Sequence, residues 1–105
     1  MNDKQAKIND SQRENDLQSL QTALLLYSND NISASQAYVF PTTAKYKTAL
    51  VPKYIAQIPT DPKTKQDYPY QVSQTFDSFT LKAMFENPAT GTTGFLCNQQ
   101  GCQNY

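Results

Sequence analysis

Hydrophobic residues recur at helical spacing in one stretch of the chain. They lie three or four positions apart and therefore fall on one side of a helix: Leu17, Leu20, Leu24 and Tyr27. Small polar residues at 29–31 favour a turn directly afterwards. We therefore expect the packed part of an amphipathic helix over residues 17–28, with its end near Tyr27 or Ser28.

The preceding segment, 1–16, is almost wholly polar but contains neither proline nor glycine. Ala6 and Ile8 are its only apolar residues after Met1. Such a segment tolerates helical structure but gains little from packing, because it has little apolar surface to bury. We expect residues 1–16 to be the polar, projecting start of the same helix, either in solvent or against a partner.

Residues 29–67 are expected to form a long loop that contains one short helix. Thr42 or Thr43 can cap a helix over 44–50. Pro52 then ends it, because proline cannot donate a backbone hydrogen bond.

Two later stretches alternate between apolar and polar residues, which is typical of half-buried strands. They cover 68–72 and 79–85, and a third short strand is expected over 94–98. The residues of the second strand that we expect to face inward are Phe79, Leu81 and Phe85. Loops of hairpin length separate the strands, so residues 68–98 predict an antiparallel meander with one buried face.

A sheet of three or four short strands needs a helix over its apolar face. Only the stripe within 17–28 is long enough to provide one. The sequence therefore predicts a single α+β domain over 1–105, in which a long N-terminal amphipathic helix packs across a small, three- to four-stranded antiparallel sheet.

Charge and composition exclude several classes of function. Nine basic residues balance nine acidic ones, so the chain has no basic excess of the kind that nucleic-acid binding needs. Histidine is absent, which excludes nucleophile activation by a Ser-His or Cys-His pair. Asp61 and Asp67 are the candidate acid–base pair, but they flank a Lys-Thr-Lys turn and we expect both to be solvated. We predict no catalytic residue and do not expect an enzyme.

Two cysteines lie close together near the C-terminal end. Cys97 and Cys102 enclose four residues, among them Gly101, which can supply a turn. Two thiols without histidine cannot form the usual four-ligand zinc site, and the spacing is not that of a Cys-x-x-Cys redox motif. We therefore expect a structural disulfide that closes the tail 97–105, stabilises it by about 2 kcal/mol and indicates an oxidising compartment.

No apolar run approaches the roughly 20 residues needed to cross a bilayer. The longest one is 23–27. We expect either a cytosolic protein or one whose exporting segment lies outside this sequence, and the predicted disulfide favours the second.

The order of these segments resembles the type IV pilin family. Residues 16–31 are similar to the second half of the pilin helix, in which Asp-Leu is followed by a further apolar residue, Ala-Leu and Tyr before a polar turn. Residues 50–62 resemble the segment that leads into the pilin sheet, and residues 68–83 resemble its central hairpin. The C-terminal cysteine pair is similar to the disulfide-bounded region of many pilins.

This resemblance implies a structural subunit, a major or minor pilin, of a type IV pilus-like filament at the cell surface. In the family an apolar half-helix precedes the part seen here, anchors the subunit in the inner membrane and later packs in the filament core. The expected partners are other pilin subunits, the pilus assembly machinery and, before assembly, the inner membrane.

Two alternatives remain open. The first is a type II secretion pseudopilin, whose family carries a calcium site near the sheet. The acids available for one, Asp61, Asp67 and Asp77, lack the dense spacing of a calcium loop, so we expect no cofactor and keep calcium as the weaker alternative. The second is a secreted module that binds DNA or a surface ligand. Because the lysines between 45 and 82 are spread out and balanced by acids, we interpret them as solubilising charge and do not expect nucleic-acid binding.

Overall fold

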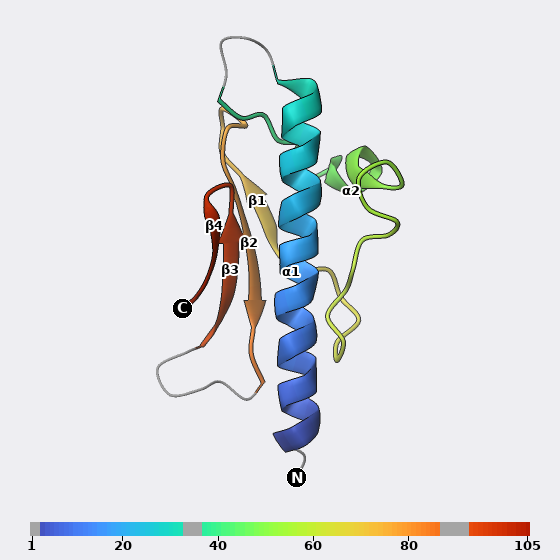
Figure 1. The fold of residues 1–105 in the computed structure, drawn as a ribbon, viewed down its shortest axis with the longest axis vertical. Coiled ribbons are helices and arrows are strands. Elements are labelled where there is room, and N and C mark those ends of the chain that lie inside the picture. The colour runs from blue at the N-terminus through green and yellow to red at the C-terminus, as the bar shows by residue number, and fades with distance from the viewer. Residues whose placement is uncertain (1–2, 33–36, 87–92) are drawn as a thin grey trace.

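One long helix, α1 (Asp3–Asn31), runs along the longest dimension of the molecule and packs across a small sheet (Figure 1). The computed structural model describes residues 3–32, 37–86 and 93–105. A second, short helix, α2 (Tyr46–Leu50), contacts α1. The predicted α+β class, with a long N-terminal helix on an antiparallel sheet, is confirmed.

The four strands follow one another in space in their sequence order, and every neighbouring pair is antiparallel. They are β1 (Tyr70–Val72), β2 (Phe79–Met84), β3 (Gly94–Asn98) and β4 (Gly101–Asn104). The register aligns Tyr70 with Leu81, and Leu81 with Cys97. Successive strand residues point to opposite faces, so these aligned side chains share one face of the sheet. All three are buried, and α1 contacts both β2 and β3.

The core forms where the leucine stripe of α1 meets this apolar face. Its fully buried members from the predicted set are Leu17, Leu20, Leu24, Phe79 and Leu81. Tyr27 and Phe85, which belong to the same predicted set, are half-buried and pack against its edge. Burying one large apolar side chain contributes about 2 kcal/mol, so this contact supplies much of the driving force for folding.

Aromatic rings from the loop and from α2 complete the core. Phe40 meets Phe79 edge to face, with ring centroids 4.7 Å apart. Tyr46 stacks on Tyr70 at 4.4 Å, and the Tyr70 hydroxyl donates a hydrogen bond to the carbonyl of Pro41 at 2.7 Å. The loop is therefore attached to the sheet edge by ring contacts and by a buried polar contact.

The end of α1 differs from the prediction, because the helix continues to Asn31. Polar residues that favour a turn find partners here instead. The Asn31 amide donates to the Tyr27 carbonyl at 2.8 Å, and the Tyr54 hydroxyl donates to Asp30 at 2.8 Å. The Val39 N–H donates to the Ser28 hydroxyl at 2.9 Å. The contact within the helix and the two contacts from the following loop stabilise the last helical turn.

The short helix also differs in its capping. It begins at Tyr46, after Lys45, and no side chain caps it. Thr42 contributes its carbonyl, which accepts the Lys45 N–H at 3.0 Å, rather than its hydroxyl. The predicted cap at Thr42 or Thr43 is therefore wrong.

The C-terminal tail forms a strand, β4, in addition to the predicted disulfide. Cys97 and Cys102 are bonded to each other and lie directly opposite in the β3–β4 register, so the disulfide is confirmed. The hairpin between these strands closes at Asn98 and Gly101. Gly101 has a φ of 150°, a backbone conformation that residues with a side chain rarely adopt.

Candidate functional site

Arg13 lies within the charged part of α1, yet it is only 2 % exposed. Its Nε and Nη2 donate to the two carboxylate oxygens of Asp61 at 2.8 and 2.9 Å. Its Nη1 donates to Asp10 at 2.7 Å, and its Nη2 lies 2.8 Å from a carboxylate oxygen of Glu86. We call Asp10, Arg13, Asp61 and Glu86 the Arg13 cluster. One guanidinium thus joins α1 to the loop before β1 and to the chain that follows β2.

Further donors hold the carboxylates of the Arg13 cluster. Asp10 accepts the backbone N–H of Glu86 at 2.8 Å, and the Asn9 amide donates to Glu86 at 2.8 Å. Asp61 also accepts two backbone N–H groups of its own turn, at 2.8 and 3.1 Å. Buried charges are tolerated only when they are paired and hydrogen-bonded, and these groups meet that condition.

The contacts within the cluster favour the charged forms of Arg13, Asp61 and Glu86. The hydrogen bonds from Arg13 lower the pKa of Asp61 to about 2. The pKa of Glu86 is also lowered, first by the hydrogen bond from Asn9 and then by Arg13. Asp61 in turn raises the pKa of Arg13. Because Asp61 and Glu86 bind protons so weakly, they are poorly suited to general acid–base chemistry at neutral pH.

A second polar contact lies one turn further along α1. The Tyr68 hydroxyl donates to Asp16 at 2.6 Å, and both residues are buried. Burial, followed by the hydrogen bond to Asp16, raises the pKa of Tyr68. This contact attaches α1 to the segment that enters β1, close to where the leucine stripe begins.

The buried charges correct two predictions. We expected residues 1–16 to project into solvent or to lie against a partner, but Asp10, Arg13 and Asp16 are buried within this chain. We expected Asp61 to be solvated, but Arg13 holds both of its carboxylate oxygens. Helical spacing could have predicted that Arg13 and Asp16 are buried. Each lies four residues before a core leucine and therefore on the same face of the helix.

The opposite face of α1 is exposed and carries no charge over most of its length. Its exposed positions between Lys7 and Asp30 are Ile8, Ser11, Gln12, Asn15, Gln18, Ser19, Thr22, Leu26 and Asn29. We call this set the uncharged helix face. Its central part borders an open hollow of about 510 Å³, which Tyr54 and Ile55 close on the other side. Exposed helix faces usually carry charged residues, so this face is unusual.

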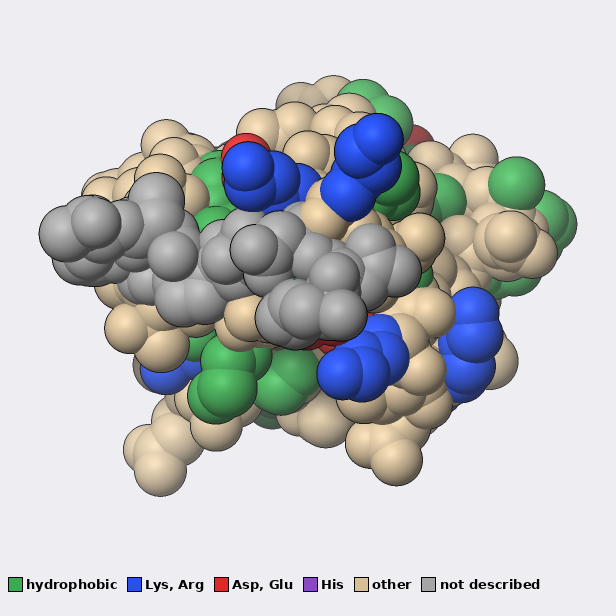
Figure 2. Space-filling model, turned by 90° about the horizontal axis from the view of Figure 1, so that it is seen from below, with side chains coloured by type: hydrophobic (Ala, Val, Ile, Leu, Met, Phe, Trp, Pro, Cys, Tyr) green, Lys and Arg blue, Asp and Glu red, His purple; other side chains and the backbone are tan. Residues whose placement is uncertain are grey.

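The end of the molecule at which α1 begins is rich in lysine. Figure 2 looks at this end and shows basic side chains around it, with little acidic surface in view. Lys4, Lys7 and Lys65 are exposed, and the Lys63 side chain is 67 % exposed. The acids of the Arg13 cluster lie deeper, so the formal charge balance of the chain hides an uneven distribution at its surface.

The three acids considered for calcium have different partners. Asp61 belongs to the Arg13 cluster, whereas Asp67 forms an exposed ion pair with Lys47. Asp77 accepts hydrogen bonds from the hydroxyls of Ser73 and Thr75 at 2.9 and 2.6 Å. Within the described ranges, no three histidine, cysteine, aspartate or glutamate side chains are placed so that they could hold a metal ion.

None of the helices in the described residues combines the length and the hydrophobicity needed to cross a bilayer. Comparison with known proteins returns no family model, no curated protein and no solved structure that matches this chain. Its function must therefore be inferred from its own residues and from the geometry of its helix and sheet.

Proposed function

We propose that this protein is a structural, non-catalytic subunit of a type IV pilus-like filament and that it contacts neighbouring subunits through α1. The observation that carries the proposal is the uncharged helix face, which extends along a helix that spans the molecule. The sequence resemblance described above supplies the family, and the proposal includes no cofactor.

An uncharged exposed face is suited to packing against another subunit. Removing a hydroxyl or an amide from water costs much less than removing a charge, and such groups find new hydrogen-bond partners in an interface. Identical faces that carry charge would also repel one another when copies of one chain assemble. Ile8 and Leu26, which are 56 % and 49 % exposed, add apolar surface toward the two ends of this face.

The direction of α1 also supports the proposal. The helix extends past the end of the sheet toward its N terminus (Figure 1). An apolar half-helix joined there, as the resemblance implies, would continue away from the sheet without meeting it. In this arrangement the lysine-rich end lies nearest to the anchor.

The Arg13 cluster suits a subunit that must carry mechanical load. A force that pulls on the start of α1 acts through its contacts on the sheet, α2 and their loops, which we call the head. Arg13 attaches α1 to segments 48 and 73 residues further along the chain, through Asp61 and Glu86. The contact with Asp61 is bidentate, and separating a buried charge from its partners is costly, so the head stays attached to its helix.

Immunogold electron microscopy of cells that produce the full-length protein tests the proposal. Antibodies against this chain should label surface filaments along their length. Ser19→Lys places a charge at the centre of the uncharged helix face and should abolish or sharply reduce the filaments. The matched control is Gln71→Lys, which adds the same charge to an exposed position of β1 and should leave them intact.

Both variants should keep wild-type folding stability within about 0.5 kcal/mol, because both positions are exposed. The proposal is wrong if the protein is found only as a free monomer, or if Ser19→Lys assembles as well as the control. Loss of protein secretion in cells that lack surface filaments would favour the pseudopilin alternative.

A further inference from the structure

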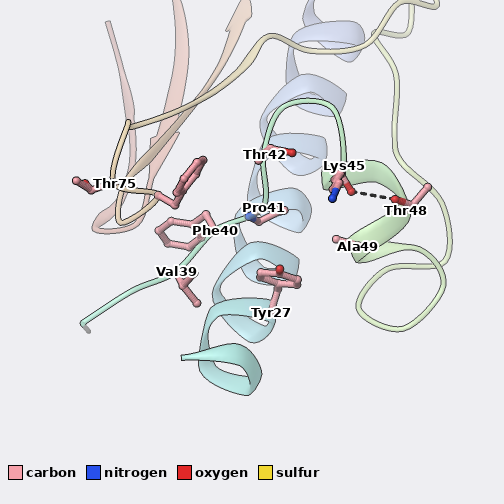
Figure 3. A pocket seen from close by; sticks show the side chains of 10 residues that line it. Tyr27, Val39, Phe40, Pro41, Thr42, Lys45, Thr48, Ala49 and Thr75 are labelled. Atoms are coloured by element: carbon pink, nitrogen blue, oxygen red, sulfur yellow. Dashed lines mark hydrogen bonds between the residues drawn. The ribbon is translucent and has the colours of Figure 1, made fainter. Parts of the chain in front are cut away.

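An open pocket lies between the last turns of α1, the loop before α2, α2 itself and the β1–β2 turn (Figure 3). Its volume is about 390 Å³, which is within the usual range for small-molecule sites. Its apolar lining includes Tyr27, Phe40, Pro41 and Phe76. Figure 3 shows Tyr27 reaching from α1 toward the loop that carries Phe40 and Pro41, with Lys45 and Ala49 on the other side.

Phe76 is held in an unfavourable conformation at this pocket. Its φ is 60°, in the left-handed region, which costs a residue with a side chain roughly 1–2 kcal/mol. Its N–H donates to the Ser73 carbonyl at 3.0 Å, and its carbonyl accepts the Phe40 N–H at 2.8 Å. Both bonds are made by the backbone, so neither of them requires a phenylalanine side chain at this position.

The Phe76 ring is left partly open to solvent by the rest of the chain. Its side chain remains among the exposed large hydrophobic groups, with the residue 40 % exposed. The ring contacts between described aromatic residues do not involve it. A strained and exposed aromatic residue beside a pocket is explained if a bound molecule covers it.

The polar groups of the pocket indicate the charge of that molecule. Lys45 is the one charged residue in the lining. Asp77 is connected to the lining through the Thr75 hydroxyl but does not belong to it. The Tyr27 hydroxyl has no hydrogen-bond partner within the described part of the chain and can donate to a ligand.

We propose that this pocket binds a flat aromatic compound that carries one anionic group, such as an aromatic carboxylate. The ring lies against Tyr27 and Phe76, and the carboxylate pairs with Lys45. The aromatic side chains of Tyr27, Phe40 and Phe76 in the lining favour an aromatic ring over a sugar, because rings pack well on one another. The site is independent of the filament proposal, since it lies on the head and needs no second subunit.

Titration of the full chain with 2-naphthoate, followed by amide NMR spectra, tests this site. We expect saturable binding of one molecule, with shifts concentrated in residues 39–45 and 73–78. The neutral analogue 2-naphthalenemethanol should bind about fivefold more weakly, since one partly solvated ion pair contributes roughly 1 kcal/mol. Glucuronate carries the same charge on a sugar ring and should bind more weakly than 2-naphthoate.

Two variants with matched controls identify the residues involved. Phe76→Asn removes the ring, while asparagine tolerates a positive φ, and should weaken naphthoate binding about tenfold. Its control is Lys65→Asn, because Lys65 has a φ of 63° in a different loop. Lys45→Gln should weaken binding about fivefold, whereas Lys82→Gln on β2 should not.

The amide spectra of each variant report whether it is folded, so a loss of binding in an unfolded variant is recognised. The proposal is overturned if 2-naphthoate causes no saturable shifts at these residues, or if Phe76→Asn binds it as tightly as the wild type does. Equal binding of naphthoate and its neutral analogue would overturn the role of Lys45.

Discussion

At the scale of single residues, Arg13 has the most consequential position in the molecule. It is almost fully buried and pairs with three carboxylates that come from three separate parts of the chain. Burying a charge is costly unless its partners are in place, so Arg13 and its acids depend on one another. Two predictions follow from this mutual dependence.

Replacing Arg13 should destabilise the fold strongly. Arg13→Leu leaves buried carboxylates without a counter-charge and should lower the free energy of unfolding by about 3–5 kcal/mol. Arg13→Lys keeps the charge but cannot make the two-point contact with Asp61, so its loss should be smaller. Urea unfolding followed by circular dichroism measures both. Lys4→Leu, an exposed change on the same helix, should stay within about 0.5 kcal/mol, and an equally small loss for Arg13→Leu would contradict the role of the cluster.

Stability should fall in acid because of Asp61. Its pKa is about 2 in the folded protein and about 3.9 in an unfolded chain, so the folded state favours the ionised form. The resulting stability is present above about pH 4 and disappears as the pH falls through about 2, a change of about 2 kcal/mol. The lowered pKa of Glu86 acts in the same direction.

Urea unfolding between pH 5 and pH 2 measures this effect. Asp61→Asn should remove part of the acid-dependent loss, because it has no carboxyl group to protonate. Asp67→Asn alters an exposed ion pair, so its free energy of unfolding should fall with pH about as steeply as that of the wild type. Identical slopes for wild type and Asp61→Asn would rule out the assignment.

At the scale of elements, the buried side of α1 changes in character along its length. Its first half buries charged residues and its second half buries leucines, although both halves belong to one continuous stripe. A pattern search that counts only apolar residues therefore finds the second half and misses the first. The same search misses β4, because this strand is mostly polar and is held in the sheet by its pairing with β3.

The disulfide should stabilise the β3–β4 hairpin. In the chain-entropy model, removing a disulfide that closes so short a loop lowers the free energy of unfolding by about 2 kcal/mol. The Cys97→Ala/Cys102→Ala variant should therefore unfold at lower urea concentration. Hydrogen exchange should become faster in β4 while β2, which pairs on both sides, keeps its protection. A reducing agent should reproduce the effect in the wild type and change nothing in the double variant. An unchanged exchange rate in β4 would show that strand pairing alone holds it.

At the scale of the whole molecule, the shape is set by α1. The described part of the chain measures 52 × 28 × 18 Å, and a 29-residue helix is itself about 43 Å long. The sheet covers only part of that length, so the molecule is elongated (Figure 1). Such a shape, with one uncharged helix face and one lysine-rich end, is consistent with a subunit that is ordered along an axis.

Small-angle X-ray scattering should detect this elongation. The radius of gyration of the Cα atoms is 14.4 Å, whereas a compact domain of this length has about 13 Å. Extrapolated to zero concentration, where subunits are separated, we expect a value at or above 14.4 Å. A value near 13 Å would mean that α1 does not extend in solution as described.

The helix-on-sheet architecture could be predicted because its signals are local. The spacing of Leu17, Leu20 and Leu24 and the alternation in 79–85 need no knowledge of the rest of the chain. The disulfide could be predicted for the same reason, because only four residues separate the two cysteines. For the uncharged helix face, the residue types are visible in the sequence, but which of them are exposed is not.

Only the tertiary structure decided which polar residues are buried and which partners they contact. Arg13 and Asp61 are 48 residues apart, and no local pattern states that they meet. The same holds for the last turn of α1, which is stabilised by Val39 and Tyr54, and for the pocket beside Phe76. Burial of an apolar side chain needs no specific partner, so periodicity already indicates where the leucine stripe is buried. A charge or a hydrogen-bonding group can be buried only beside a partner in the right geometry. Folding brings that partner into place from a distant part of the chain.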